Sequence, residues 1–485
     1  MANSNIKAKA VSGIIWKFAE RWSAQIVSFV VSIVLARLLM PAQYGEVAMI
    51  LVFINIADVF VSDGFSTALI QKKDADKTDF STMFYCSLAI SVLFYGILFF
   101  SAPLIARFYN NENLIWLLRI FSLKLPIASI NSIQHAYVSR NMLFKKFFFS
   151  TIIGTVTSGI VGIAMAYFGC GTWSLIAQYL VNSVMDTAIL FITIDWRPTR
   201  DFSRSSAKAL LSYGWKITLG SLLNSVYNEC RSLVIGKKYT SDDLAYYNKG
   251  KQFPTLFTTN VNSAIGSVTF PLISDYSDDK QMMKKIARKS MQLTSYVTFP
   301  LMLGLLAVSK PLIIILLTEK WIIAVWFLRV ACIGEMLQPI NTVNLQLIKA
   351  SGRSDLFLKM EIIKKLTGVL MVVAAMSFGV KAIAISDICA VVFANIVNAV
   401  PNKKLVGYSY FEQIRDLLPN MLCAAVMFGA AFAISFIGLN VYLTIILQVI
   451  TGAAVYLLLS VVFRIKAFYA LIDLVKQKKT NPNRD

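Results

Sequence analysis

Long apolar stretches separated by short polar segments run through the whole chain. A membrane-spanning helix needs about 20 mostly apolar residues, so this pattern predicts an all-α membrane protein with about 14 transmembrane helices. The stretches cover 11–38, 43–66, 80–106, 114–137, 148–168, 172–195, 209–236, 252–275, 288–308, 322–348, 357–379, 382–400, 416–437 and 440–463. A shorter apolar piece at 309–321 either extends the ninth helix or lies at the membrane interface.

Composition supports lipid as the solvent of this chain. Hydrophobic residues make up 57% of it and charged residues only 15%, against roughly 25% charged in soluble proteins. With the N-terminus placed in the cytoplasm, the cytoplasmic segments carry about 29 Lys and Arg and the outer loops about 8. The net charge of +21 therefore reflects membrane orientation and not a nucleic-acid partner. Both termini are predicted to be cytoplasmic, and the one exception to the alternation is an expected outer loop from Lys237 to Lys251.

The chain repeats itself at an offset of about 200 residues. Trp16-Lys17 opens the first stretch and Trp215-Lys216 the seventh, while Ile130-Asn131-Ser132-Ile133 matches Ile340-Asn341-Thr342-Val343. Parallel repeats of this kind build some secondary transporters, with the substrate path between the halves. The predicted parts are two pseudo-symmetric six-helix lobes, two added helices and a basic cytoplasmic tail, covering residues 1–200, 201–405, 406–463 and 464–485.

Cations inside the apolar stretches are candidate binding residues. An ionised group at the bilayer centre costs roughly 2.5–3.5 kcal/mol on insertion scales, so it faces a partner or a wet cavity. Arg21 and Arg231 lie on matching polar stripes of the first and seventh helices, and Arg119 recurs as Arg329 at an offset of 210. The predicted cavity cations are Arg21, Arg119, Lys124, Lys216, Arg231 and Arg329.

Acids at membrane depth are candidates for ion coupling. Asp58 and Glu335 each lie on a polar stripe, of the second and tenth helices, and we expect one of them to exchange a proton or a sodium ion. His135 is the only histidine, and we expect a structural role for it, so the chain has no histidine-based metal site and no expected cofactor. Pro126, Pro300 and other prolines interrupt apolar stretches, where they either allow rocking between two states or pack bent helices.

Several motifs, taken in order, resemble a known family. The opening contains Trp16-Lys17, Leu35-Ala36-Arg37-Leu38-Leu39 and Pro41-Ala42-Gln43-Tyr44-Gly45, and the second half contains Lys310-Pro311-Leu312 and Ala350-Ser351-Gly352-Arg353. These segments resemble Wzx-type polysaccharide flippases, in the polysaccharide-transporter branch of the superfamily that also holds MurJ and the MATE exporters. Glu319-Lys320 stands where the family usually has a glycine before Trp321.

The resemblance implies two six-helix lobes around a cationic cavity and an alternating-access flippase. Its substrate would be an undecaprenyl-diphosphate-linked oligosaccharide, carried from the inner to the outer leaflet of the bacterial cytoplasmic (inner) membrane for O-antigen, lipopolysaccharide or exopolysaccharide synthesis. The added helices would border a groove for the lipid tail. Arg21 and Arg231 would be counterparts of the family's cavity cations. Membrane lipids, a counter-ion and the polysaccharide polymerase or export machinery are the other expected partners.

Two alternatives remain open from the sequence. A MATE-like exporter of small cations would need an acidic, aromatic pocket, whereas the charge within these helices is net basic. A membrane enzyme such as a polymerase or ligase would need a large outer loop with catalytic residues, and the longest one expected here has only about 15 residues. The flippase is therefore the preferred interpretation, and the exporter is the second.

Overall fold

The computed structural model describes the backbone of residues 2–480 and the side chains of residues 13 and 16–473, and the described backbone is helical apart from short links. The prediction of an all-α fold is confirmed. The chain divides into two compact units, Met1–Ala245 and Tyr246–Asp485.

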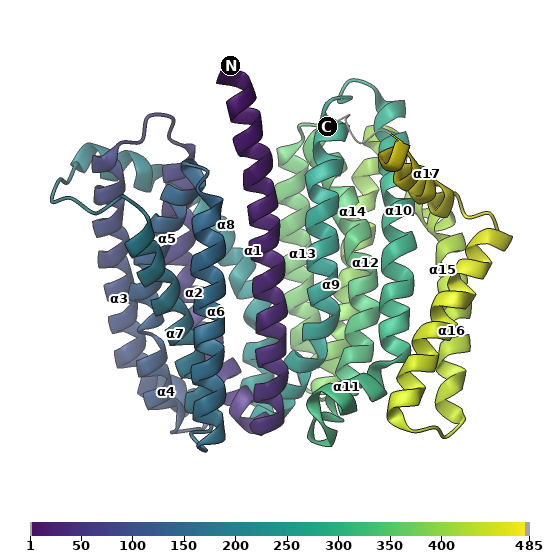
Figure 1. Ribbon diagram of the computed structural model, residues 1–485, viewed down its shortest axis with the longest axis horizontal. Coiled ribbons are helices and arrows are strands. Elements are labelled where there is room, and N and C mark those ends of the chain that lie inside the picture. The colour runs from purple at the N-terminus through teal and green to yellow at the C-terminus, as the bar shows by residue number, and fades with distance from the viewer. Residues whose placement is uncertain (1, 481–485) are drawn as a thin grey trace. The chain divides into compact units, whose positions relative to one another are not determined.

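The first unit contains the helices α1 to α8 and the beginning of α9 (Figure 1). Their bounds are α1 Ala2–Leu38, α2 Pro41–Gln71, α3 Lys77–Tyr109, α4 Leu114–Phe121, α5 Lys124–Arg140, α6 Phe144–Tyr167, α7 Thr172–Thr193 and α8 Arg204–Lys238. The predicted stretch 114–137 is broken into α4 and α5 at residues 122–123, with Pro126 in the first turn of α5. The first turn is where a proline is tolerated.

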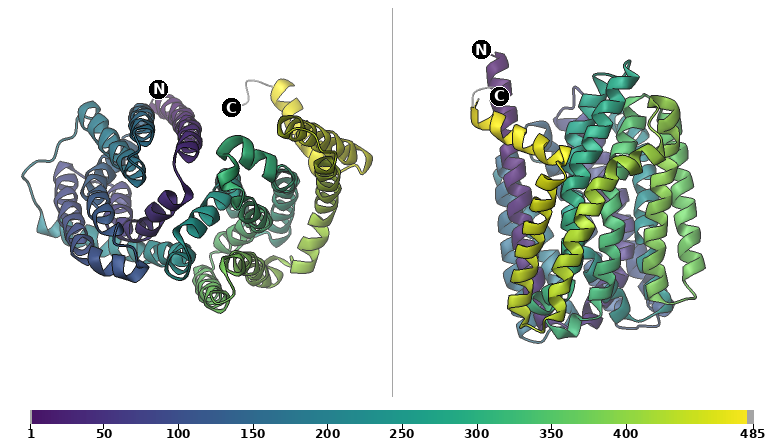
Figure 2. Two further views of the ribbon diagram at one scale, coloured as in Figure 1. Left: turned by 90° about the horizontal axis from the view of Figure 1, so that it is seen from below. Right: turned by 90° about the vertical axis from the view of Figure 1, so that its right-hand side faces the viewer.

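The second unit contains most of α9 (Ser241–Ser274) and the helices that follow it (Figures 1 and 2). Their bounds are α10 Lys280–Ala307, α11 Ser309–Leu317, the 3₁₀ turn η1 Glu319–Trp321, α12 Ala324–Ala350, α13 Ser354–Ala375, α14 Val380–Val406, α15 Tyr410–Ala433, the 3₁₀ turn η2 Ile434–Phe436, α16 Val441–Val462 and α17 Lys466–Thr480. The piece at 309–321 forms the separate short helix α11 and the turn η1, which follow α10 after a break at Val308. Thr318 adopts φ 77°, a left-handed backbone conformation that is uncommon for a residue with a side chain.

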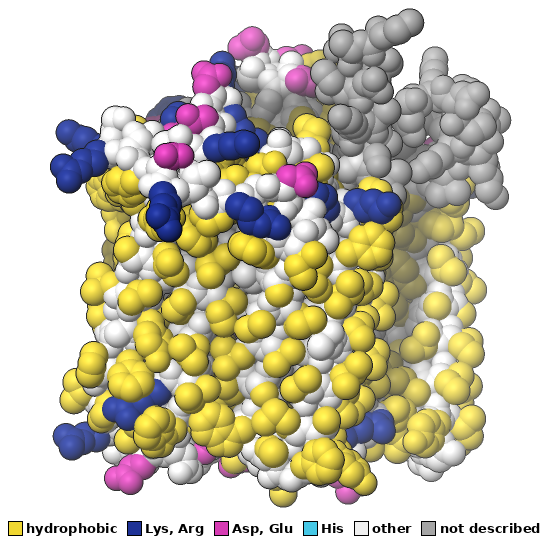
Figure 3. All heavy atoms as spheres, turned by 60° about the vertical axis from the view of Figure 1, so that its left-hand side comes forward, with side chains coloured by type: hydrophobic (Ala, Val, Ile, Leu, Met, Phe, Trp, Pro, Cys, Tyr) yellow, Lys and Arg dark blue, Asp and Glu magenta, His cyan; other side chains and the backbone are white. Residues whose placement is uncertain are grey.

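Ten segments of the described chain are long and apolar enough to span a membrane. They are α1, α2, α3, the pair α4–α5, α6, α7, α10, α14, α15 with its 3₁₀ turn, and α16. Four more helices of the predicted set, α8, α9, α12 and α13, are 22 to 35 residues long but more polar. On the face seen in Figure 3, a broad hydrophobic band has charged side chains gathered at its two edges, as expected for a surface in contact with lipid.

In the first unit, α8 packs closely along α2. Gly64 and Gly214 make the approach possible, because a Cβ at Gly64 would lie 2.7 Å from the Gly214 carbonyl oxygen and 2.1 Å from Thr218 Oγ1. Small residues play this role in membrane helix packing generally. The sequence repeat assigns α8 to the start of the second lobe, yet its packing partners here are α2 and α3. The lobe boundary at residue 200 stays a prediction.

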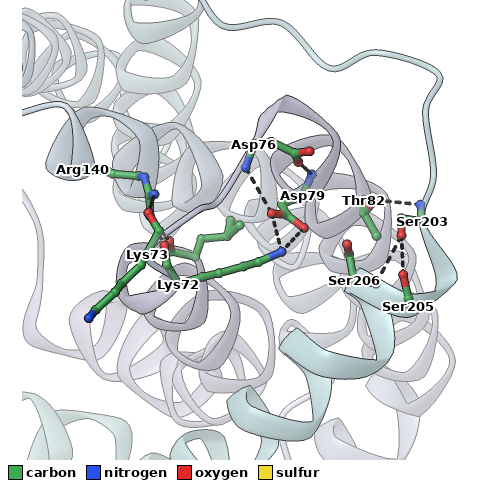
Figure 4. Close-up of polar contacts among 10 residues, drawn as sticks. Lys72, Lys73, Asp76, Asp79, Thr82, Arg140, Ser203, Ser205 and Ser206 are labelled. Carbon is green, nitrogen blue, oxygen red and sulfur yellow. Dashed lines mark hydrogen bonds and ion pairs between the residues drawn. The ribbon is translucent and has the colours of Figure 1, made fainter.

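One end of the first unit is tied together by backbone carbonyls and an ion pair (Figure 4). Arg140, in the last turn of α5, donates to the carbonyl oxygens of Leu69, Lys72 and Lys73 at the end of α2. The last carbonyls of a helix lack amide donors, so Arg140 caps α2 from outside. Lys72 Nζ lies 2.6 Å from Asp79, which also forms a capping box with Asp76 at the start of α3.

In the second unit, the hairpin α15–α16 packs against α10, and α17 turns back onto α10 (Figure 2). The core between them contains Tyr296, Met427 and Tyr456. At the end where α14 passes to α15, Arg288 forms an ion pair with Asp416. Burial raises the pKa of the Tyr408 phenol, which donates to the same carboxylate at 2.9 Å.

The expected outer loop from Lys237 to Lys251 is wrong. α8 ends at Lys238 and α9 begins at Ser241, so Lys249 and Lys251 lie inside a helix. Thr240 starts that helix: its hydroxyl accepts the Asp243 amide at 3.1 Å and donates to the Asp243 carboxylate at 2.8 Å. The Lys/Arg exception in the loop pattern therefore has a physical cause, since two of its four lysines belong to α9.

Candidate functional site

A polar cluster in the first unit joins α5 to α7. Asp186 Oδ2 accepts from Asn131 Nδ2 at 2.9 Å and lies 3.2 Å from His135 Nε2. The Asp186 side chain is only 16% exposed. His135 therefore has a polar partner in Asp186, and its structural role stays a prediction. Glu20 of α1 accepts from Thr151 of α6 at 3.4 Å, which adds a second carboxylate to the polar groups of this unit.

The predicted coupling acid Asp58 lies on α2 and is half-buried. Its Oδ1 atom accepts from Ser62 Oγ at 2.9 Å, one turn further along the same helix. One turn earlier, Asn55 Nδ2 donates to Glu229 Oε1 of α8 at 2.8 Å. The polar stripe predicted on the second helix therefore faces α8 at Asn55 and bonds within its own helix at Asp58.

The predicted coupling acid Glu335 lies on α12 and is held by two hydroxyl groups of α9. Thr258 Oγ1 is 2.6 Å from Glu335 Oε2, and Thr255 Oγ1 is 3.2 Å from Oε1. Each carboxylate oxygen of Glu335 therefore has its own hydroxyl donor.

An ion pair that the sequence analysis missed lies beside Glu335. Lys251 Nζ of α9 is 2.8 Å from Asp387 Oδ2 of α14, with the side chains 35% and 26% exposed. Both residues and Glu335 line one cavity of about 40 Å³, together with Gln338 and Tyr247. A cavity of that size holds a small number of water molecules. One lysine thus shares a small polar space with two carboxylates.

Arg119 contacts a carbonyl that a proline has left without its helical partner. Pro103 in α3 has no amide hydrogen, so the Phe99 carbonyl four residues earlier receives no helical hydrogen bond. Arg119 Nε donates to that oxygen at 3.2 Å, and its guanidinium lies 4.5 Å from the Phe99 ring centroid. This arginine has a packing role whatever else it does.

Arg329 occupies the matching place in the second unit with different partners. Its Nε atom donates to Ser309 Oγ at 2.8 Å, and its guanidinium lies 5.8 Å from the Phe432 ring centroid on α15. The segments 101–105 and 309–313 both read Ser-x-Pro-Leu-Ile. This internal match, at an offset of 208, supports the repeat and was a signal that the sequence analysis overlooked.

The other four predicted cations lie on helices of the first unit. Arg21 on α1 and Lys216 on α8 are exposed, while Lys124 at the start of α5 is half-buried. Arg231 on α8 is 4% exposed and lies 5.6 Å from the Tyr227 ring centroid. Five of the six cations therefore belong to the first unit and only Arg329 to the second. Their convergence on one cavity stays a prediction.

An apolar groove of about 520 Å³ runs along the second unit. Most of its walls come from α10, α15 and α16, and Phe257 of α9 contributes at one side. The lining residues are Phe257, Pro300, Leu301, Gly304, Leu305, Val308, Met427, Ala431, Gln448, Val449, Gly452, Ala453 and Tyr456. The hairpin α15–α16, the part predicted to lie outside the repeat, forms one side of the groove.

The chain is similar to proteins of bacterial polysaccharide synthesis. A family described as "Polysaccharide biosynthesis protein" matches residues 34–326. The teichuronic acid biosynthesis protein TuaB of Bacillus subtilis is 27% identical over 84% of this chain and 85% of its own length. The succinoglycan biosynthesis transport protein ExoT of Rhizobium meliloti is 24% identical over 98% and 97%. The lipopolysaccharide biosynthesis protein WzxC of Escherichia coli is 24% identical over 85% of each chain.

Solved transporters share the fold. The lipid II flippase MurJ in an inward closed conformation matches with a TM-score of 0.76 at 17% identity, covering 95% of this chain and all of its own. An inward-facing multidrug resistance MATE transporter of the MOP superfamily matches with a TM-score of 0.61 at 14% identity, covering 81% and 98%. The expected likeness to MurJ and MATE is confirmed.

Proposed function

Because the chain belongs to the polysaccharide biosynthesis protein family and has the fold of MOP-superfamily transporters, we propose that it flips a lipid-linked oligosaccharide across the bacterial cytoplasmic membrane. The cargo is of the undecaprenyl-diphosphate type and moves from the inner to the outer leaflet by alternating access. The chain is a multi-pass membrane transport protein and not an enzyme, as its relatives in transport indicate.

The apolar groove is the observation that carries this proposal. A long polyprenyl tail needs an apolar path beside the transporter while its charged head crosses the membrane. The groove of about 520 Å³ between α10 and the hairpin α15–α16 provides such a path, lined almost wholly by apolar side chains. An exporter of small soluble molecules has no use for a lipid-accessible groove of this kind.

Filling the groove tests its role directly. A Cβ at Gly452 would lie 3.7 Å from Met427 Cγ, so a leucine there extends into the groove without a forced clash. Gly452→Leu should abolish transport while the protein reaches the membrane in normal amounts. Gly429→Leu on α15 is the matched control, since a Cβ at Gly429 meets no atom within 4 Å and Gly429 does not line the groove. Normal transport by Gly452→Leu would remove the groove from the proposal.

The charged head of the cargo needs cationic ligands. A diphosphate sheds its water only if other donors replace it, and arginines do so with forked, charge-assisted hydrogen bonds. Arg21, Arg119, Arg231 and Arg329 are the proposed ligands, with Lys124 and Lys216 as supplementary charges. In this proposal α8, α9, α12 and α13 also cross the membrane, which gives 14 spans.

Asp58 and Glu335 are the proposed coupling acids. Each is a carboxylate at membrane depth, and among the described residues its side-chain hydrogen bonds come from hydroxyl groups. Exchange of a proton or a sodium ion at such a group would give the outward movement of the cargo a driving force.

Deletion of the gene separates the flippase from the alternative, a cation-coupled exporter with a MATE-like fold. A flippase mutant accumulates lipid-linked oligosaccharide on the cytoplasmic leaflet, where an impermeant oxidant of sugars cannot reach it in intact cells. An exporter mutant would instead become sensitive to cationic compounds and show normal lipid-linked intermediates. The second result would replace the flippase by the exporter.

Topology offers an independent check of the membrane orientation. With both termini cytoplasmic, the segment 197–206 lies inside the cell. A cysteine introduced at Arg200 should not react with an impermeant maleimide added to intact cells, and it should react after permeabilisation. A label from outside at Arg200 would refute the orientation and leave the transport test untouched.

A further inference from the structure

Two prolines, one in α10 and one in the following helix α11, deprive two carbonyls of α10 of their helical hydrogen bonds. Pro300 lies inside α10 and Pro311 in the first turn of α11. Neither has an amide hydrogen, so the carbonyls four residues earlier, at Tyr296 and Ala307, receive no helical hydrogen bond. Inside a membrane an unsatisfied carbonyl is costly, and neighbouring helices commonly supply the missing donor.

Helix α16 supplies both donors. Tyr456 Oη donates to the Tyr296 carbonyl at 2.8 Å, and Gln448 Nε2 donates to the Ala307 carbonyl at 3.4 Å. Tyr456 and Gln448 are eight residues apart, so they lie on one face of α16 about two turns from each other. They are 6% and 1% exposed. One face of α16 thus donates to both of the freed carbonyls.

Further contacts hold the two donors in place. Gln448 Nε2 also lies 2.9 Å from Ser435 Oγ, in the turn that leads to α16. The Tyr296 hydroxyl forms a 2.9 Å hydrogen bond with Ser460 of α16, and the Tyr296 and Tyr456 rings lie 5.1 Å apart. The contact between α10 and α16 is therefore a hydrogen-bonded seam and not only an apolar one.

The same residues also line the groove. Pro300, Gln448 and Tyr456 are three of its wall residues. A chain that enters the groove therefore lies against one break in α10 and against both side chains that satisfy the breaks. Any displacement of α16 by an occupant lengthens the hydrogen bonds to Tyr296 and Ala307, and it loosens α10 at Pro300 and at its junction with α11.

We propose that Tyr456 and Gln448 are positioning residues that couple occupancy of the apolar groove to bending of α10 at Pro300 and of its junction with α11 at Pro311. The occupant is a polyprenyl chain, which rests on the proposed function. The hairpin α15–α16 then both binds a lipid tail and changes the bending of α10 when that tail is bound.

Restoring the missing amide gives a direct test of the hydrogen bonds. Tyr456→Phe removes one hydroxyl, so amide hydrogen exchange in α10 around Pro300 should become faster. The expected increase is roughly threefold or more, which corresponds to the free energy of an average hydrogen bond between membrane helices. In Pro300→Ala, residue 300 can donate to the Tyr296 carbonyl itself, so adding Tyr456→Phe should change exchange little. Gln448→Met and Pro311→Ala form the second such pair. Tyr442→Phe, at an exposed tyrosine of α16, is the control.

The coupling is measured on the full-length protein in nanodiscs, with and without undecaprenyl phosphate as the probe. Exchange in α10 of the unaltered protein should change on addition of the lipid, and Tyr456→Phe/Gln448→Met should lose most of that response. An equal response in the double variant, or no response in the unaltered protein, would overturn the coupling. A flippase whose deletion phenotype is intact but whose α10 ignores the lipid retains the proposed function and loses only this inference.

Discussion

Pro103 in the first unit and Pro311 in the second lie in matching Ser-x-Pro-Leu-Ile segments, but their freed carbonyls have different partners. Arg119 bonds the Phe99 carbonyl in the first unit. In the second unit Gln448 bonds the Ala307 carbonyl, and Arg329 bonds the Ser309 hydroxyl instead. The carbonyl freed by the proline is thus satisfied by an arginine in the first unit and by a side chain of α16 in the second. Arg329 is therefore not needed to satisfy the carbonyl that Pro311 frees.

The largest expected effect concerns transport through these two arginines. Arg119→Ala and Arg329→Ala should each abolish flipping, because a diphosphate loses a forked donor. Arg→Lys at either site should restore it only in part, since the charge survives and the fork does not. Complementation of a deletion strain, with membrane levels checked by immunoblot, measures both. If both alanine variants complement fully, the arginines are structural, and the cationic cavity must rest on Arg21 and Arg231.

Next in size is the contrast between the two coupling acids. Glu335→Gln should lower transport about tenfold, equivalent to roughly 1.4 kcal/mol in the rate-limiting barrier. Asp58→Asn should have a smaller effect, since Asp58 bonds only a serine of its own helix while Glu335 shares a cavity with an ion pair. Transport assayed over a range of pH gives the result. Normal rates in both variants at every pH would show that neither acid couples.

The ion pair beside Glu335 should affect stability more than its first-unit counterpart, the pair of Asp186 with His135. Asp387→Asn leaves Lys251 without its carboxylate, and we expect a loss of about 1–3 kcal/mol for this half-exposed pair. Lys251→Met/Asp387→Asn should recover most of that loss, because the lysine charge is removed together with the carboxylate. Thermal unfolding of purified protein in detergent measures it, with Asp186→Asn as the comparison. A double variant no more stable than Asp387→Asn would mean that the pair is not the cause.

The smallest expected effect is the difference between Arg119 and Arg329 in their contribution to stability. Arg119→Ala should lower stability by about 0.6–1.7 kcal/mol, the range of single hydrogen bonds between membrane helices. Pro103→Ala in the same chain should restore it, because residue 103 can then donate to the Phe99 carbonyl. Arg329→Ala should lower stability less, since Ala307 keeps Gln448. If Pro103→Ala restores the stability of Arg119→Ala but not its flipping, Arg119 binds the cargo in addition to stabilising α3.

Periodicity predicted the helices well and their interruptions poorly. The stretch 322–348 appears as α12, Ala324–Ala350, whereas 114–137 is divided at residues 122–123, where neither residue is glycine or proline. The start of α9 was missed because Lys249 and Lys251 look like loop residues. The Thr240-x-x-Asp243 capping box was the local signal that marks a helix start there.

The candidate residues show the same limit. Asp58 and Glu335 could be chosen from a helical stripe, but long-range partners are set by tertiary packing. Thr258 lies 77 residues from Glu335, Asp387 lies 136 from Lys251, and Tyr456 lies 160 from Tyr296. No local pattern encodes such a distance. A proline in the sequence predicts a carbonyl without a helical hydrogen bond four residues earlier. Only the fold shows which side chain donates to that carbonyl.

The close approach of Gly64 to Gly214 has a consequence for how the chain can be divided into two genes. A cut at residue 200 would leave α2 with an uncovered glycine face in one polypeptide and α8 in the other. A cut at residues 239–240, between α8 and α9, would keep that seam within a single fragment. Co-expressed halves divided at 239–240 should reassemble into a working protein more readily than halves divided at 200, although the sequence repeat places the natural joint at the earlier point.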